Sequence, residues 1–189
     1  MRSFRPRLVL AAMAMIGASI LVLLAADCPN PSVNIGPPRD PSVPPDWYVP
    51  GDFGTIQAAI GNASAGGSIL VASGTYDERI TLKDGVTLLG EDRDATIIDA
   101  GGMQNNGGSP TIENCEFSGN TGIGTNENYG AGMYNVDSSP TISGCIFENN
   151  VALEGSDSQS GRGGGMYNEN CANVTIGGCV FQGNQAHSY

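Results

Sequence analysis

Few side chains in this 189-residue chain have the type and spacing that enzyme chemistry needs. Lyase-type chemistry would need a strong base, often Arg, beside carboxylates that hold Ca²⁺. The single histidine, His187, has no pattern around it that indicates a Ser-His-Asp triad. We therefore predict no catalytic residues, although these basic side chains would be the candidates for an enzyme: Arg79, Lys83, Arg93 and Arg162.

Metal ligation is not favoured by the sequence either. The acidic turn at 91–94 could bind Ca²⁺, but it lacks the Asp/Gly periodicity of calcium-binding β-rolls, and an ion pair at Arg93 explains it as well. Cys28 and Cys171 have no His or Cys partners at zinc spacing. We predict no metal site and no cofactor, with Ca²⁺ at this turn as the open alternative.

Two tyrosines are the strongest candidates for binding. Tyr134 and Tyr167 occupy equivalent places beside Met133 and Met166, which should point inward, so the tyrosines should point outward and stack. An exposed aromatic pair suits sugar rings or a protein partner, and stacking that only supports strand register is the alternative. Insertions at 121–130 and 151–163 should leave one corner, either as a binding face or as solvent loops.

The elements that position these residues come from a repeat with a period of about 30 residues. Each copy holds Gly-Met-(Gln/Tyr)-Asn, then Thr-Ile, then Cys-x-Phe-x-x-Asn. The Gly-Met segments start at Gly102, Gly132 and Gly165, and the Thr-Ile pairs start at Thr111, Thr141 and Thr175. Such units bury their apolar faces against their neighbours in the stack.

Within each copy we expect two short β segments. In the second copy, alternation places Ile142, Cys145 and Phe147 inside, with a bend at Ser143 and Gly144. The repeated cysteines then serve as small inward hydrophobes, and five cysteines leave at least one thiol unpaired. Their positions are Cys115, Cys145 and Cys179. An Asn that follows each Phe should form a stacked amide ladder at a left-handed corner: Asn120, Asn150 and Asn184.

The fold class follows from these patterns. No helical stripe runs through the repeats, and they are too short for a propeller blade. We predict an all-β, right-handed parallel β-helix (solenoid) with a short N-terminal capping α-helix. The helix should begin after Thr55 as N-cap, with Ile56 and Ile60 on its buried face. Further strands are expected at 68–72, 79–82, 86–89 and 96–99.

The N-terminal residues predict export. Residues 1–26 combine three arginines with an apolar run, as in a signal peptide, while a retained membrane anchor or lipidation at Cys28 stay open. Residues 27–48 read as a Pro-rich linker. We assign 49–100 to the cap and first coils and 101–189 to three repeats (101–130, 131–163, 164–189), apparently truncated. The predicted location is secreted or cell envelope, with membrane contact only through the N-terminal segment.

The net charge of the chain limits the classes of molecule that it can bind. The chain carries 8 basic and 19 acidic residues, a net charge of −11. This balance argues against nucleic acid, which is bound mainly by Lys and Arg. It is typical of a soluble exported surface.

Two family resemblances follow from particular motifs. Residues 55–60, 74–76 and 90–98 resemble the opening of pectin methylesterases, within the pectin-lyase-like fold. In that family the catalytic residues lie in later coils, and nothing after Gly101 matches them. The repeats resemble the Gly-Gly-x-(Ile/Met) and Phe-x-x-Asn motifs of polymorphic outer-membrane proteins, which implies surface exposure.

From this we expect a non-catalytic surface or secreted protein that binds an extracellular polysaccharide or cell-surface component. A truncated or degenerate polysaccharide lyase or pectinesterase is the alternative.

Overall fold

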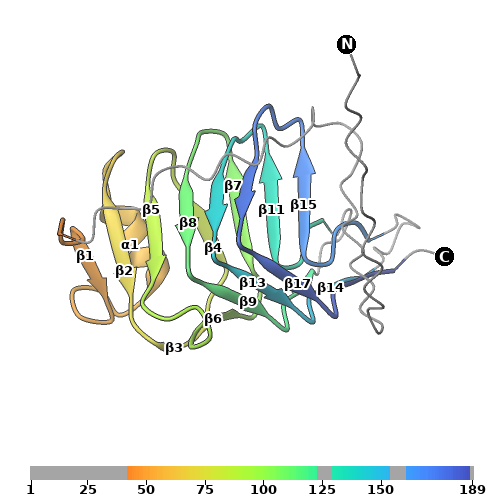
Figure 1. Cartoon of the computed structure of the whole chain (residues 1–189), viewed down its shortest axis with the longest axis horizontal. Coiled ribbons are helices and arrows are strands. Elements are labelled where there is room, and N and C mark those ends of the chain that lie inside the picture. Colours follow the sequence, from red (N-terminus) through yellow and green to blue (C-terminus); the bar gives the residue numbers. More distant parts are fainter. Residues whose placement is uncertain (1–41, 123–128, 154–160, 188–189) are drawn as a thin grey trace, which may run out of the picture.

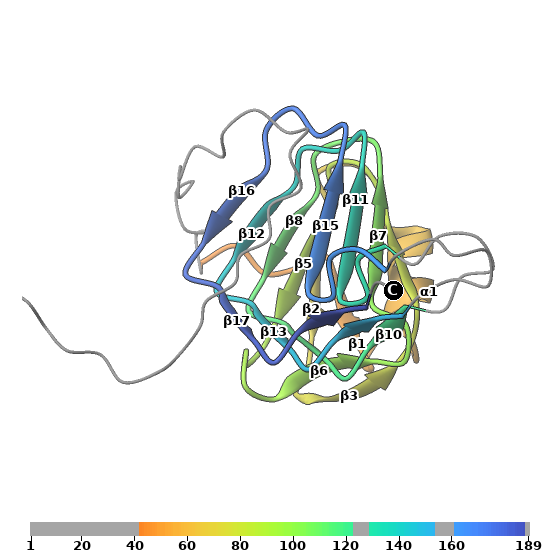
Figure 2. The same ribbon diagram turned by 90° about the vertical axis from the view of Figure 1, so that its right-hand side faces the viewer.

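The computed structural model describes residues 42–122, 129–153 and 161–187. In this part of the chain, short strands follow one another around a coil, and each strand pairs in parallel with its equivalent in the next coil. Figure 1 shows the coils stacked along the long axis, and Figure 2 shows the strands of one coil enclosing a common interior. The predicted all-β parallel β-helix is confirmed.

Four parallel sheets form the walls, and we name them A to D. Sheet A contains β1 (Trp47–Val49), β2 (Ser68–Val71), β5 (Thr87–Gly90), β8 (Thr111–Glu113), β12 (Thr141–Ser143) and β16 (Thr175–Gly177). Sheet B contains β3 (Gly74–Asp77), β6 (Thr96–Asp99), β9 (Glu116–Ser118), β13 (Ile146–Glu148) and β17 (Val180–Gln182). Sheet C contains β4 (Ile80–Leu82), β7 (Met103–Asn106), β11 (Met133–Val136) and β15 (Met166–Glu169). Sheet D contains β10 (Thr121–Gly122), β14 (Val151–Ala152) and β18 (Gln185–Ala186).

The expectation of two β segments per repeat is wrong. The segment from Thr-Ile to Phe divides into two strands on different sheets, because a left-handed residue turns the chain between them. Asn114, Gly144 and Gly178 occupy this place, with φ of 52°, 60° and 63°. A further short strand in sheet D follows the Asn that ends each repeat motif. Strand β3 is a further strand that was not predicted, between the strands expected at 68–72 and 79–82.

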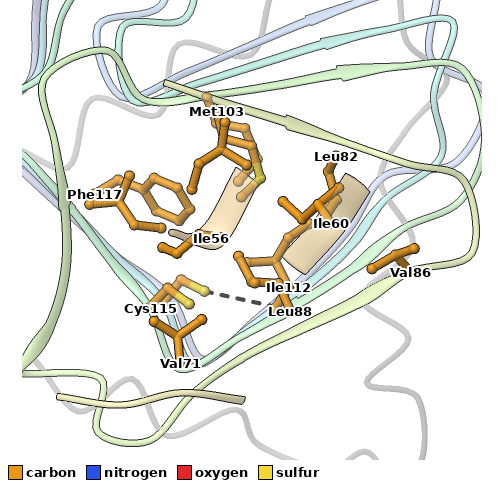
Figure 3. Close-up of a cluster of buried hydrophobic side chains, with 14 of the residues drawn as sticks. Ile56, Ile60, Val71, Leu82, Val86, Leu88, Met103, Ile112, Cys115 and Phe117 are labelled. Carbon is orange, nitrogen blue, oxygen red and sulfur yellow. Dashed lines mark hydrogen bonds between the residues drawn. The ribbon is translucent and has the colours of Figure 1, made fainter. Parts of the chain in front are cut away.

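A single apolar column fills the interior. Ile112, Cys115 and Phe117 are fully buried, and Figure 3 shows them facing the same interior as Ile56 and Ile60 of the N-terminal helix. The Phe rings stack from coil to coil with nearly parallel planes: the Phe117–Phe147 centroids lie 4.9 Å apart and the Phe147–Phe181 centroids 4.7 Å apart. The predicted inward column is confirmed, and only its last members in the described chain are partly exposed: Ile176, Cys179 and Phe181.

The helix α1 (Ile56–Asn62) packs against β1, β2 and β4. The side chain of Thr55 accepts a hydrogen bond from the Ala58 amide, as expected of an N-cap. The carboxylate of Glu78 accepts two more, from the amides of Ile56 and Gln57. These bonds satisfy amides that a helix leaves unpaired at its start.

The predicted asparagine ladder is present, with Asn120 and Asn150 fully buried and Asn184 partly buried. The Asn120 side-chain amide donates to Asn150 Oδ1 at 2.9 Å, and the Asn150 amide donates to Asn184 Oδ1 at 2.9 Å. The left-handed backbone lies one residue earlier than expected, at Gly119, Asn149 and Gly183. The ladder asparagines are therefore selected for their hydrogen bonds and not for their φ angle.

The first strand begins within the segment expected to be a linker, since β1 includes Trp47 and Tyr48 and pairs with β2. The expected signal peptide and Cys28 lie outside the described residues. Within the described residues, no helix has the length and apolar character that crossing a membrane requires.

Candidate functional site

The outer face of sheet C carries a column of in-register side chains. Gln104, Tyr134 and Tyr167 are Cα partners on β7, β11 and β15. The residues before them, Met103 and Met133, are buried in the core. Strand alternation therefore turns the tyrosines outward, as predicted, and their ring centroids lie 5.9 Å apart in a stacked arrangement.

A third tyrosine completes an aromatic platform that we define as Tyr129, Tyr134 and Tyr167. The Tyr129 ring stacks on Tyr167 at 4.7 Å between centroids and lies 5.6 Å from Tyr134. Each ring is partly exposed. Three partly exposed tyrosines from two coils thus lie together on one outer surface.

Two left-handed glycines return the chain to this surface. Gly130 and Gly163 have φ of 54° and 63°. A Cβ at Gly130 would lie 2.1 Å from Met133 O, and one at Gly163 would lie 2.3 Å from Met166 O. Only glycine fits so close to the following strand, and this close turn brings Tyr129 back over Tyr134.

Arg162 packs on the platform from the next coil. Residues Tyr129 and Arg162 form a parallel β-bridge, so they are equivalent in the two coils. The guanidinium carbon of Arg162 lies 5.5 Å from the Tyr129 ring centroid, a cation–π distance. Its Nη1 donates to the Tyr167 hydroxyl at 3.4 Å. Both contacts hold the tyrosine rings in place.

A shallow depression of about 150 Å³ adjoins the platform. Tyr129, Tyr134, Gln104 and Arg79 line it together with small residues of the neighbouring turns. Arg79 is exposed, and within the described residues it has no hydrogen-bond or ion-pair partner. The depression therefore combines aromatic rings, one amide and one available guanidinium.

Tyr134 is fixed by a short hydrogen bond. Its hydroxyl donates to Glu169 Oε2 at 2.5 Å. Burial, together with this bond and the Glu169 charge, raises the pKa of Tyr134 well above its ordinary value. The phenol stays protonated at neutral pH, so it serves as an oriented wall of the site and not as a base.

Comparison with known protein families agrees with this geometry. The family model described as "Right handed beta helix region" matches residues 55–188, more than half of the chain. The chain belongs to this right-handed β-helix family. No curated protein and no solved structure matches it significantly.

In this right-handed β-helix, the acidic turn at 91–94 and its Arg93 do not contribute to the tyrosine site. Arg93 forms an ion pair with Asp94 at 3.4 Å, on an exposed turn. Among the described residues, no three His, Cys, Asp or Glu side chains are grouped as metal ligands would be. The calcium alternative at 91–94 therefore gains no support from the geometry.

The sequence predicted Tyr134 and Tyr167 as a binding pair and named Arg79 and Arg162 only as candidates for an enzyme, and it did not identify Tyr129. Tyr129 and Arg162 each stand five residues before the repeated tyrosine, which was a readable signal at equivalent positions of two copies. Arg79 had no such signal, because it lies in an earlier coil with a different sequence. The described ends of the two insertions lie side by side, since β10 pairs with β14 and Tyr129 is bridged to Arg162, whereas residues 123–128 and 154–160 lie outside the described part.

Proposed function

We propose that this protein is an exported, non-catalytic β-helix protein that binds an extracellular glycan on the tyrosine platform of sheet C. The observation that carries this proposal is the stacked set Tyr129, Tyr134 and Tyr167 beside a depression with Arg79. Tyrosine rings offer flat apolar faces to the C–H faces of sugars and hydroxyls to their polar rims.

The ligand chemistry is indicated by the depression. A sugar that stacks on Tyr134 would meet the guanidinium of Arg79 and the amide of Gln104 at its edge. Guanidinium groups bind carboxylates in a bidentate fashion. A glycan with acidic sugars therefore fits this depression better than a neutral glycan does. The guanidinium of Arg79 provides a local positive charge in a chain whose net charge is −11.

Two sequence features support the location. The N-terminal 26 residues have the pattern of an export signal, and the repeats resemble those of polymorphic outer-membrane proteins. Contact with a cell-surface component in place of a free polysaccharide would use the same platform.

Glycan-array binding and titration calorimetry with purified protein test the proposal. We expect binding to at least one acidic glycan, and a loss of at least tenfold in affinity in the Tyr134→Ala/Tyr167→Ala double variant. Tyr48→Ala is a matched control, because Tyr48 is exposed on β1, which lies at the edge of sheet A and not in sheet C. Unchanged binding by the double variant would show that the platform is not the site.

Arg79→Gln separates charge from stacking. We expect it to weaken acidic ligands several-fold and to leave neutral ligands unchanged. An equal loss for both classes would contradict the role of the guanidinium.

The alternative is a polysaccharide lyase or pectinesterase. Arg79 in the depression is the one observation in its favour, since Arg can act as a base in such chemistry. Incubation with pectin or polygalacturonate and Ca²⁺ decides the matter. Unsaturated product or released methanol, lost in Arg79→Gln, would replace the binding proposal with this enzyme.

A further inference from the structure

The interior cysteines form a ladder whose last two members are placed to react together. Cys115, Cys145 and Cys179 hold the same position in successive coils, because the Ile146 amide donates to Cys115 O and the Val180 amide donates to Cys145 O, at 3.0 and 2.9 Å. Equivalent Cα atoms of paired parallel strands lie about 4.8 Å apart. That spacing falls within the range of about 4.4–6.8 Å that disulfides span.

The thiols of Cys145 and Cys179 also have equivalent surroundings in adjacent coils. Cys145 Sγ donates to Ser143 O at 3.4 Å, and Cys179 Sγ lies 3.7 Å from Ile142 O. Cys145 Sγ also contacts Ile112 O at 3.8 Å, and Cys179 Sγ also contacts Gly177 O at 3.5 Å, so the two sulfurs hold corresponding positions one coil apart. The proximity of the two thiols raises the pKa of Cys145 and lowers that of Cys179.

Exposure distinguishes this pair from the one before it. Cys115 and Cys145 are both fully buried, so no external reagent reaches either sulfur in the folded protein. Cys179 lies in the last described coil and is only partly buried. The pair with one reachable sulfur is Cys145 and Cys179.

We propose that Cys145 and Cys179 are a thiol pair that a small disulfide oxidant converts into an intrachain disulfide bond between two coils. The inference is independent of the proposed glycan site. It assigns a modification site inside the solenoid that locks two successive coils together.

The chemistry balances with oxidised glutathione as the oxidant. The Cys179 thiolate attacks one glutathione sulfur, which forms a mixed disulfide and releases one glutathione thiolate. Cys145 then loses its proton and attacks Cys179 Sγ, which forms the Cys145–Cys179 bond and releases the second glutathione. Two protein thiols lose two protons and two electrons, and one glutathione disulfide becomes two thiols.

The test uses the full chain, fully reduced and then incubated with oxidised glutathione under native conditions. Non-reducing digestion and mass spectrometry should show one peptide pair that joins Cys145 and Cys179. The Cys115→Ser variant is the control and should form the same link. Cys145→Ser should stop at glutathione on Cys179, and Cys179→Ser should show neither product.

Other outcomes would overturn the proposal. In the wild type, Cys179 could remain reduced or could remain as a mixed disulfide with glutathione. A Cys145–Cys179 link that forms only in denaturant would also contradict the proposal. Circular dichroism of each variant establishes that it is folded before it is scored. A higher urea midpoint of the oxidised than of the reduced wild type is expected, since a crosslink constrains the unfolded chain.

Discussion

Removal of the central asparagine of the buried ladder should destabilise this protein more than any exposed substitution on the same corner. Asn150 makes four hydrogen bonds through its side chain. Its amide donates to Phe117 O and Asn184 Oδ1, and its carbonyl accepts from the backbone and side-chain amides of Asn120. The side chain has no exposed surface, so water cannot replace these partners.

The magnitude follows from the groups left behind. In Asn150→Ala, the Asn120 amide and Phe117 carbonyl lose these bonds in a buried place, while the Asn120 side chain keeps its bond to Ile98 O. Each orphaned buried group costs about 1–3 kcal/mol. We expect a loss of about 2–6 kcal/mol, out of a total free energy of unfolding of typically about 5–15 kcal/mol.

Urea denaturation followed by circular dichroism measures this loss. Asn149→Gly is the matched control, because Asn149 is the adjacent left-handed corner residue and its equivalents in the neighbouring coils are Gly119 and Gly183. It should change the free energy of unfolding by less than about 0.5 kcal/mol. A loss below about 1 kcal/mol in Asn150→Ala would refute the view that the ladder stabilises the coil stack.

Two further predictions concern the interior. Gly90→Ala should strongly lower the melting temperature, because the new Cβ would lie 1.8 Å from Asn114 O. Gly61→Ala is the control: its Cβ meets no atom within 4 Å, and it should stabilise helix α1 by about 0.5–1 kcal/mol. Similar effects of the two variants would contradict the close approach of Gly90 to Asn114. Burial raises the pKa of Cys115 from 9.0 to about 12, so the folded state keeps a proton that the unfolded state loses as pH rises above 9. The stability advantage of wild type over Cys115→Ala should therefore shrink between pH 9 and 12 in urea titrations, and a constant difference would contradict a buried neutral thiol.

Several parts of this architecture could be predicted because they repeat. The recurrence of Ile, Cys and Phe at fixed places identifies the inward column, and the Asn that follows identifies the ladder. Thr55 could be recognised as an N-cap from its place before an apolar stripe. A bend at Ser143 and Gly144 was predicted, but not that it divides the Thr-Ile to Phe segment into strands of two different sheets, because the φ of a single residue such as Asn114 or Gly144 decides it.

The binding site shows the same limit. Tyr134 and Tyr167 were predictable, since strand alternation and the repeat fix both their direction and their register. Tyr129 reaches the same surface only through the tight turn at Gly130, and Arg79 reaches it from an earlier coil. No pattern in the sequence relates Arg79 to the tyrosines.

The sequence by itself determined the period, the inward and outward faces of the strands and therefore the stacked β-helix. These features depend on local alternation and on the match between adjacent copies, both of which are written along the chain. The tertiary structure decided which side chains from different coils line one surface, such as Arg79 and Tyr134 at the depression. Which side chains lie together depends on the number of residues in each turn and on the left-handed residues at the corners. These two features set the register with which each coil stacks on the next.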